Sequence, residues 1–234
     1  MNISRLELYH YPATRSARVK WVLHETVGDD FETIRVDLYG GDQYKPDFTA
    51  LNPNHCVPLL KIEWADGGVT NMTESAAMVA LFADAFPQAG LAPPAADMSP
   101  ARADYLRMMH FAASPMDMML WQVRCHEHLL ATADSDQRTI DRCRQKFADE
   151  VEPQLLARLD ASAFICGDAF TAADILVGHN VSWARAYGLC QHDAFRGYLS
   201  RLAKRPAFLK AFADAREFSV APPAAAREAR VFKV

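Results

Sequence analysis

The chain of 234 residues has room for one large domain or two modest ones, and its 50% hydrophobic content is ordinary for a globular protein with a buried core. Its formal net charge of -4 argues against nucleic acid as a partner, because a polyanion calls for a basic surface. No signal-peptide region and no apolar stretch of membrane-helix length is present, and the five cysteines form no Cys-x-x-Cys pair, so we expect a cytoplasmic protein with free thiols that is not inserted in a membrane.

Strand and helix patterns alternate from the N-terminus onward. Residues 6–9 alternate as a short strand, and the turn-like residues 11–14 follow. Residues 16–27 carry apolar side chains at helical spacing, with Gly28 as a stop. Residues 31–38 alternate again, which predicts a second strand after this helix.

A hairpin and a closing helix complete this first region. Residues 57–62 and 69–72 predict two strands that flank Asp66-Gly67-Gly68, and residues 73–86 predict a helix. The order β-α-β-loop-β-β-α predicts an α/β domain over residues 1–86, with helices packed on the sheet.

The remainder of the chain predicts helices only. A proline-rich stretch at 87–100 is typical of a linker, and the following domain is expected to be all-helical over 101–234. Thr171 and Asp174 form a capping-box pattern, for which the structural interpretation is favoured. The predicted helices cover 101–109, 116–130, 136–159, 172–187, 193–202 and 206–218.

Three local patterns carry possible chemistry. An X-Pro bond can be cis, so Val57-Pro58 can turn the backbone groups of Val57 out of the sheet toward an extended peptide; the alternative is a proline that merely heads an edge strand. Glu74 and Ser75 begin a predicted helix, whose free N–H groups favour binding of a ligand carboxylate, while Glu74 can accept from a ligand ammonium group. The alternative interpretation is that these residues are an N-cap.

The turn after the first strand places hydroxyls at the start of a helix, in residues 11–18. A hydrogen bond to a charged sulfur contributes roughly 1.5–3 kcal/mol and a helix N-terminus roughly 0.3–1 kcal/mol. Lowering a thiol pKa by about two units requires ~2.7 kcal/mol, so one hydroxyl suffices in principle. Helix capping is again the alternative interpretation.

The combination of these patterns resembles the cytosolic glutathione S-transferases of the serine/threonine, bacterial-like type. The resemblance covers nearly the whole chain: the hydroxyl-bearing turn, Asn52-Pro53 with Val57-Pro58, Glu74-Ser75, Phe164 to Leu176 with its capping box, and Leu202 to Phe208. It implies a thioredoxin-like N-terminal domain, an all-helical C-terminal domain, a homodimer, and glutathione as cosubstrate with no other cofactor. The expected activity is that of a glutathione transferase. The alternatives are a glutathione-dependent isomerase or disulfide reductase on the same fold, or a non-catalytic glutathione-binding protein.

The resemblance also implies roles for single residues. The backbone of Val57, before Pro58, would pair with the cysteinyl part of glutathione, and Glu74 and Ser75 would hold its γ-glutamyl end. Lys45 would reach the glycyl carboxylate.

The catalytic hydroxyl and the second substrate remain open at this point. Thr14 is the first choice for the group beside the thiol, Ser16 the second and Tyr11 the third. A small hydrophobic electrophile is expected between this turn and a methionine-rich wall that includes Met108, Phe111 and Met116, although a plain core is the competing interpretation.

Two further features are expected to be inert. Where many relatives carry Gly-Lys, this chain has His55-Cys56, and Cys56 in a strand is expected to be unreactive. His126 and His128 lie two apart, which is not metal spacing on a helix, so no metal site is expected.

Overall fold

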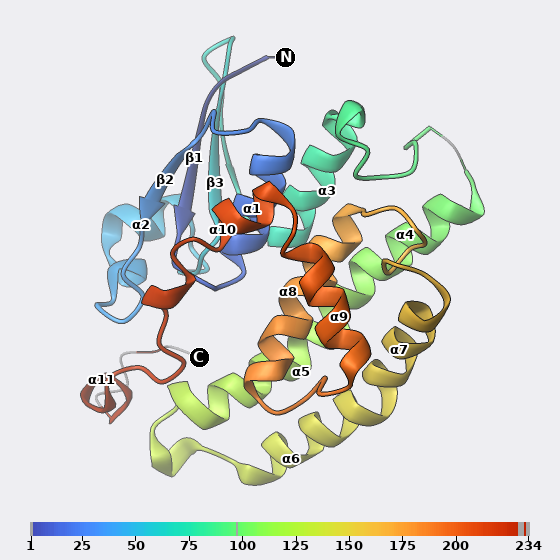
Figure 1. The fold of residues 1–234 in the computed structure, drawn as a ribbon. Coiled ribbons are helices and arrows are strands. Elements are labelled where there is room, and N and C mark those ends of the chain that lie inside the picture. The colour runs from blue at the N-terminus through green and yellow to red at the C-terminus, as the bar shows by residue number, and fades with distance from the viewer. Residues whose placement is uncertain (1, 97, 229–231, 233–234) are drawn as a thin grey trace. The chain divides into compact units, whose positions relative to one another are not determined.

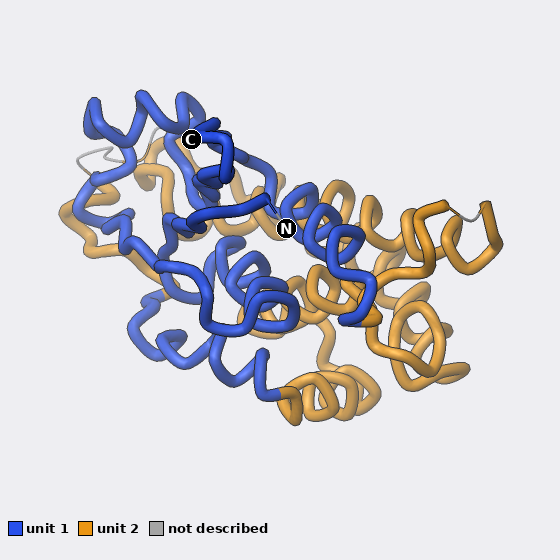
Figure 2. Tube along the Cα trace, turned by 90° about the horizontal axis from the view of Figure 1, so that it is seen from above, with its two compact units in different colours: residues 1–89, 206–219 blue, residues 90–205, 220–234 orange. Residues whose placement is uncertain are grey.

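The computed structural model describes residues 2–96, 98–228 and 232, and the chain forms two compact units (Figure 2). The first unit contains Met1–Ala89 together with Pro206–Ser219, and the second contains Gly90–Arg205 together with Val220–Val234. Residues 206–219 were expected in the helical domain that begins at residue 101. Here the structure differs from the predicted division, because this segment packs with the N-terminal unit.

The first unit is built on a mixed four-stranded sheet in the order β2-β1-β3-β4. Strand β1 is parallel to β2 and antiparallel to β3, and β3 and β4 form the predicted hairpin. This thioredoxin-like arrangement confirms the predicted fold class, with one addition: residues 46–51 form a short helix where a loop was expected. The elements are β1 (Ile3–His10), α1 (Ser16–Thr26), β2 (Glu32–Arg35), α2 (Pro46–Leu51), β3 (Leu59–Trp64), β4 (Val69–Met72) and α3 (Ser75–Ala85) (Figure 1).

The two-residue period of β1 gives each face of the sheet its own core. Leu8 is fully buried and lies opposite Leu60 of β3. Tyr9 points to the other face, where its ring meets Phe48 of α2 at 5.9 Å between centroids. Both faces are therefore covered by apolar side chains, as a central strand requires.

The returning segment is held to α1 by aromatic packing. Helix α10 (Pro206–Ala211) lies beside α1 in Figure 1. Trp21 of α1 is fully buried, and its ring lies 4.9 Å from that of Phe208 and 6.0 Å from that of Phe212. Edge-to-face aromatic pairs of this kind stabilise by about 0.5–1.5 kcal/mol beyond the area they bury, so the segment completes the core of the first unit.

The second unit contains only helices in its described residues, apart from one isolated bridge between Phe164 and Gly167. No helix in the described part of the chain is long and apolar enough to cross a membrane. The α-helices are α4 (Pro100–Phe111), α5 (Asp117–Arg124), α6 (Gln137–Lys146), α7 (Glu152–Ala161), α8 (Ala172–Ala186), α9 (Asp193–Leu202) and α11 (Ala224–Glu228).

A π-helical turn joins α4 to α5 at Ala112–Met116. Pro115 lies inside it and has no N–H to donate, which disrupts the α-helical register. The fully buried Asn180 of α8 donates its side-chain N–H to the carbonyl of Ala112 at 2.7 Å. The methionine-rich helices predicted separately over 101–109 and 116–130 therefore form one continuous helical segment with a π-helical bulge at Ala112–Met116.

Helix α8 begins with the predicted capping box. The Thr171 N–H donates to Asp174 Oδ2 at 2.9 Å, and the Thr171 side chain accepts from the backbone of Asp174. The same carboxylate accepts from the N–H of Ile165 and the hydroxyl of Tyr198, both at 2.9 Å. The box is therefore the centre of a buried network that ties a loop and α9 to the start of α8.

Candidate functional site

The Val57–Pro58 peptide bond is cis, as the sequence suggested. Strand β3 begins at Leu59, so Val57 lies just outside the paired part of the sheet. In the described part of the chain, the N–H and C=O of Val57 make no hydrogen bond to another backbone group. This arrangement offers an extended peptide one donor and one acceptor.

Val57 and the turn after β1 belong to one cluster. The side chains of Val57, Tyr11, Phe48 and Leu59 pack together, and Phe218 of the returning segment covers them. The free backbone edge and the hydroxyl-bearing turn are therefore neighbours in the first unit.

Glu74 precedes α3 in a strained conformation. Its φ is 69°, a region that L-residues rarely adopt, and its side chain makes no cap hydrogen bond. Glu74 therefore holds the N-cap position of α3, as the alternative interpretation expected, but its exposed side chain does not cap the helix. Ala13 and His55 also have positive φ, so three of the four such non-glycine residues in the described chain lie in the predicted site segments. Strained backbone commonly gathers at functional sites.

Ser75 is the first residue of α3 and is buried. Its hydroxyl accepts from Arg18 of α1 at 3.4 Å, which places the starts of the two helices side by side. Arg18 is itself 1% exposed, and a buried guanidinium together with two helix N-termini favours an anion here.

Thr14 and Ser16 differ in exposure. Thr14 is half-buried, whereas Ser16 is fully buried. Neither hydroxyl caps α1, whose N-cap residue is Arg15. The Thr14 hydroxyl donates to the carbonyl of Tyr11 at 2.8 Å and lies 2.9 Å from Ser16 Oγ. The capping alternative is wrong for this turn, and of the two hydroxyls the geometry favours Thr14 for contact with a ligand.

Ser16 connects Thr14 to a buried histidine that sequence reasoning missed. Ser16 Oγ lies 2.7 Å from His10 Nδ1, and His10 Nε2 lies 3.1 Å from Asp214 Oδ2. Lys20 Nζ donates to the same carboxylate oxygen at 2.6 Å. Asp214 follows α10 in the returning segment, so no spacing in the sequence could have revealed the pair.

Burial sets the charge of this group of residues. Desolvation lowers the pKa of His10, although the hydrogen bond to Asp214 raises it in part. Burial alone would raise the pKa of Asp214, but hydrogen bonds from His10 and Lys20 outweigh it and lower that pKa well below its usual range. The resting state at neutral pH is therefore a neutral imidazole beside a carboxylate.

Lys45 and the 52–58 loop lie together at the other end of the site. Lys45 is exposed and pairs with Asp42 at 2.6 Å. Tyr44 stacks at a tilt on His55 with ring centroids 5.0 Å apart, so the residues beside Lys45 contact the loop that leads to Val57. Water and salt screen an exposed ion pair, so Lys45 can exchange Asp42 for a ligand carboxylate with little loss of stability.

Cys56 is held in the same loop. The Asn52 amide donates to its carbonyl at 2.7 Å. Cys56 is exposed and lies in a loop, not in a strand as expected. Partial desolvation of its sulfur nevertheless raises the pKa of the thiol, so less of it is ionised at neutral pH.

The residues predicted to contact a second substrate are largely buried. Tyr11 is 4% exposed, with its ring 5.5 Å from that of Tyr39. In the second unit, Met108 and Met116 are 4% and 0% exposed and Phe111 is half-buried. Their role as a substrate wall stays a prediction.

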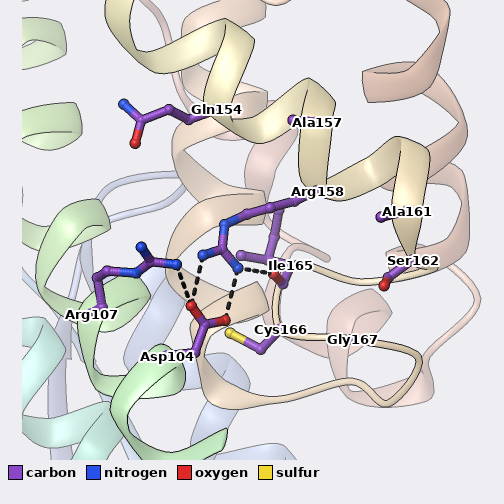
Figure 3. A pocket seen from close by; sticks show the side chains of 10 residues that line it. All are labelled: Asp104, Arg107, Gln154, Ala157, Arg158, Ala161, Ser162, Ile165, Cys166 and Gly167. Atoms are coloured by element: carbon purple, nitrogen blue, oxygen red, sulfur yellow. Dashed lines mark hydrogen bonds and ion pairs between the residues drawn. The ribbon is translucent and has the colours of Figure 1, made fainter. Parts of the chain in front are cut away.

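A pocket of about 520 Å³ lies in the second unit (Figure 3). Arg158 binds Asp104 through two hydrogen bonds of 2.7 and 2.8 Å, and Arg107 points to the same carboxylate. Desolvation and nearby carboxylates raise the pKa of Cys166 to about 12, so this thiol is inert. The pocket contains no predicted glutathione contact; its lining is Asp104, Arg107, Gln154, Ala157, Arg158, Ala161, Ser162, Ile165, Cys166 and Gly167.

A family model and two curated relatives relate this chain to glutathione-dependent proteins. Residues 14–85 match the model of the glutathione S-transferase N-terminal domain. Glutathione S-transferase 3 of Zea mays is 32% identical over 180 residues, which cover 72% of this chain and 73% of that protein. The disulfide-bond oxidoreductase YfcG of Escherichia coli is 26% identical over 86% of this chain and 92% of its own length.

The solved structures agree with the sequences. A glutathione transferase from Burkholderia graminis, with two glutathione molecules bound per subunit, superposes with a TM-score of 0.75 at 25% identity, over 92% of this chain and 90% of that one. The cis peptide, the strained Glu74 and the hydroxyl turn lie on the same thioredoxin-like frame. The chain therefore belongs to the glutathione S-transferase family.

Proposed function

We propose that this protein is a glutathione transferase that ionises the thiol of bound glutathione and directs the thiolate at a small hydrophobic electrophile. The observation that carries the proposal is the cis Val57–Pro58 bond, which leaves the backbone groups of Val57 without a backbone partner among the described residues. The Val57 side chain packs in one cluster with Tyr11, whose carbonyl accepts from the half-buried Thr14 hydroxyl. Glutathione is the cosubstrate, and the chemistry requires no other cofactor.

Each end of the tripeptide has a matching group in this proposal. Val57 pairs with the cysteinyl backbone, Glu74 accepts from the γ-glutamyl ammonium group, and Ser75 with the α3 N-terminus receives the neighbouring carboxylate. Lys45 pairs with the glycyl carboxylate after it leaves Asp42.

Catalysis follows from thiolate formation and proximity. A free thiol has a pKa of about 8.5, so only a few per cent is ionised at neutral pH. One hydrogen bond to the charged sulfur and the nearby N-terminus of α1 together supply about 2–4 kcal/mol, which is enough to lower the thiol pKa by one to three units. Holding the electrophile beside the sulfur supplies the remaining acceleration.

A variant pair tests the role of Thr14. Thr14→Ala is expected to bind glutathione with nearly unchanged affinity but to lose about 10- to 100-fold in kcat/KM with a chloronitrobenzene electrophile, because one charged hydrogen bond is removed. Thr14→Ser keeps the hydroxyl and should retain most activity. Calorimetry and the conjugation rate are the two measurements, and equal loss in both variants would contradict the proposal.

Disulfide reduction is the second candidate, because the Escherichia coli relative is a disulfide-bond oxidoreductase. No cysteine lies in the turn at residues 11–18, so reduction here would use the thiolate of glutathione itself. Two glutathione molecules would be oxidised to their disulfide while the substrate disulfide takes up two electrons and two protons. Turnover of a small dithiol-forming disulfide in the absence of conjugation would favour this candidate.

A homodimer remains the expectation from the family. Light scattering of the purified protein checks it directly. A monomer at micromolar concentration would overturn it.

A further inference from the structure

We propose that Ser16 and His10 form a buried relay that takes the thiol proton of glutathione from Thr14 and stores it on His10 beside Asp214. This inference rests on the proposed function, because it concerns the fate of the proton that thiolate formation releases. His10, Ser16 and Asp214 act through Thr14 and are positioning residues, since only Thr14 meets the ligand.

The resting direction of each hydrogen bond follows from Asp214. A carboxylate only accepts, so His10 Nε2, at 3.1 Å from Asp214 Oδ2, carries the proton. Nδ1 of the neutral ring is then an acceptor, and Ser16 donates to it at 2.7 Å. Ser16 Oγ in turn accepts from the Tyr11 N–H at 3.2 Å and is 2.9 Å from Thr14 Oγ1.

This direction leaves Thr14 as an acceptor toward the ligand. Its proton points inward, to Ser16 Oγ at 2.9 Å or the carbonyl of Tyr11 at 2.8 Å. The lone pairs of Thr14 Oγ1 are then available to the S–H group of glutathione. A hydroxyl in this state receives a thiol proton but gives no hydrogen bond to a thiolate.

Ionisation of the thiol reverses the three hydrogen bonds between the sulfur and His10, whereas His10 Nε2 continues to donate to Asp214. The S–H bond breaks and its proton passes to Thr14 Oγ1, the Thr14 proton to Ser16 Oγ, and the Ser16 proton to His10 Nδ1. The products are a thiolate and an imidazolium, with atoms and charge conserved. Thr14 now donates to the sulfur, Ser16 to Thr14, and His10 to both Ser16 and Asp214, so no hydrogen bond is lost.

Three charged side chains from different parts of the chain act on the protonation of His10. Asp214 after α10 favours the imidazolium, whereas Lys20 of α1 and Arg35 of β2 oppose it. Burial also opposes it, which keeps the ring neutral until a thiolate forms at the end of the relay. The new negative charge then supports the new positive one, and the proton stays within the protein.

The experiment measures thiolate and released protons together. Ultraviolet difference absorbance gives the thiolate formed on the enzyme, and calorimetry in buffers of different ionisation enthalpy gives the protons released to solvent. For the native chain we expect much less than one proton released per thiolate. His10→Asn keeps an acceptor near the position of Nδ1 but takes up no proton, so it should raise the pKa of the bound thiol by about one unit, a tenfold change, and release one proton per thiolate.

Two further variants separate a relay from a packing role. Ser16→Ala interrupts the chain and should resemble His10→Asn, with glutathione affinity retained. Lys20→Met removes the competing partner of Asp214 and should lower the pKa of the bound thiol, because His10 then holds a proton more easily. A purely structural network would instead weaken thiolate formation in all three variants.

The outcomes distinguish the two proposals. Thiolate formation with one proton released per thiolate in the native chain overturns the relay and leaves the proposed function intact. The same holds if the pKa of the bound thiol is equal in the native chain and His10→Asn. Absence of glutathione binding by the native chain overturns the proposed function, and the relay with it.

Discussion

Glu74 shows how one residue can be held in a conformation that its own chemistry disfavours. A φ of 69° with no cap hydrogen bond costs free energy that a glycine at this position would not lose. Backbone strain of this kind is retained when it holds a side chain in the position that its function requires. In the proposed site, the strained backbone positions the Glu74 carboxylate to accept from the ammonium group of glutathione.

A pair of substitutions at Glu74 separates strain from binding. Glu74→Gly is expected to raise the free energy of unfolding by up to about 1 kcal/mol while weakening glutathione binding about tenfold or more, because a charged hydrogen bond of roughly 1.5–3 kcal/mol is lost. Glu74→Gln keeps the strain and should lose affinity without gaining stability. Urea unfolding and calorimetry measure the two effects, and a clear loss of stability in Glu74→Gly would refute the strain interpretation.

At the same scale, sequence reasoning predicts local backbone features, whereas the roles of the site residues stay predictions. Val57, Pro58, Glu74 and Ser75 each lie at an element boundary that their own segment defines, so the cis bond and the helix start could be predicted. His10 had no such signal, because Asp214, its partner, lies 204 residues away along the chain.

Among the elements, α8 depends most on a single buried carboxylate. Asp174 is fully buried and accepts from Thr171, Ile165 and Tyr198, while burial raises the pKa of its carboxyl. Removing it leaves the N–H groups of Thr171 and Ile165 and the hydroxyls of Thr171 and Tyr198 without this acceptor. The capping box is thus only the part of this network that lies close together in the sequence.

Asp174→Ala is expected to lower the free energy of unfolding by about 3–5 kcal/mol, since each unsatisfied buried donor costs about 1–3 kcal/mol with partial relaxation. Asp193→Ala is a matched control at the start of α9, where the carboxylate is 82% exposed and pairs with Arg196. It should cost less than about 1 kcal/mol. Equal losses for the two variants in urea unfolding would contradict this account.

Two elements show the limits of pattern reading. Helix α2 has only six residues, so its period is too short to separate it from a loop. The π turn at Ala112–Met116 depends on Pro115 and on the amide of Asn180 in another helix. Neither feature changes the fold class: α2 is one additional short helix, and the π turn concerns how α4 and α5 are joined.

For the whole molecule, the returning segment 206–219 is the main departure from the expected domains. Its helical pattern was recognised, but the unit it completes depends on tertiary packing with Trp21. The first unit therefore becomes complete only with residues that follow Gly90–Arg205, the longer segment of the second unit. Through Asp214, the same segment supplies the end of the buried chain that leads to Thr14.

The stability of the whole chain is expected to peak between about pH 7 and 8. Burial lowers the pKa of His10, His24 and His128. Below about pH 6.5 the unfolded chain therefore binds more protons than the folded chain, and the free energy of unfolding falls.

A second loss of stability follows between about pH 4 and 2, because hydrogen bonds from Arg158 lower the pKa of Asp104 to about 2. On the alkaline side the Cys166 pKa of about 12 means that only the unfolded thiol ionises above about pH 8.5, which again favours unfolding. Urea unfolding across the pH range measures all three arms. Asp104→Asn should reduce only the second loss. His10→Asn should reduce the first loss and part of the second, because the hydrogen bond from His10 helps to lower the pKa of Asp214. A free energy of unfolding that stays constant from pH 7 to 5 would contradict this account of the buried histidines.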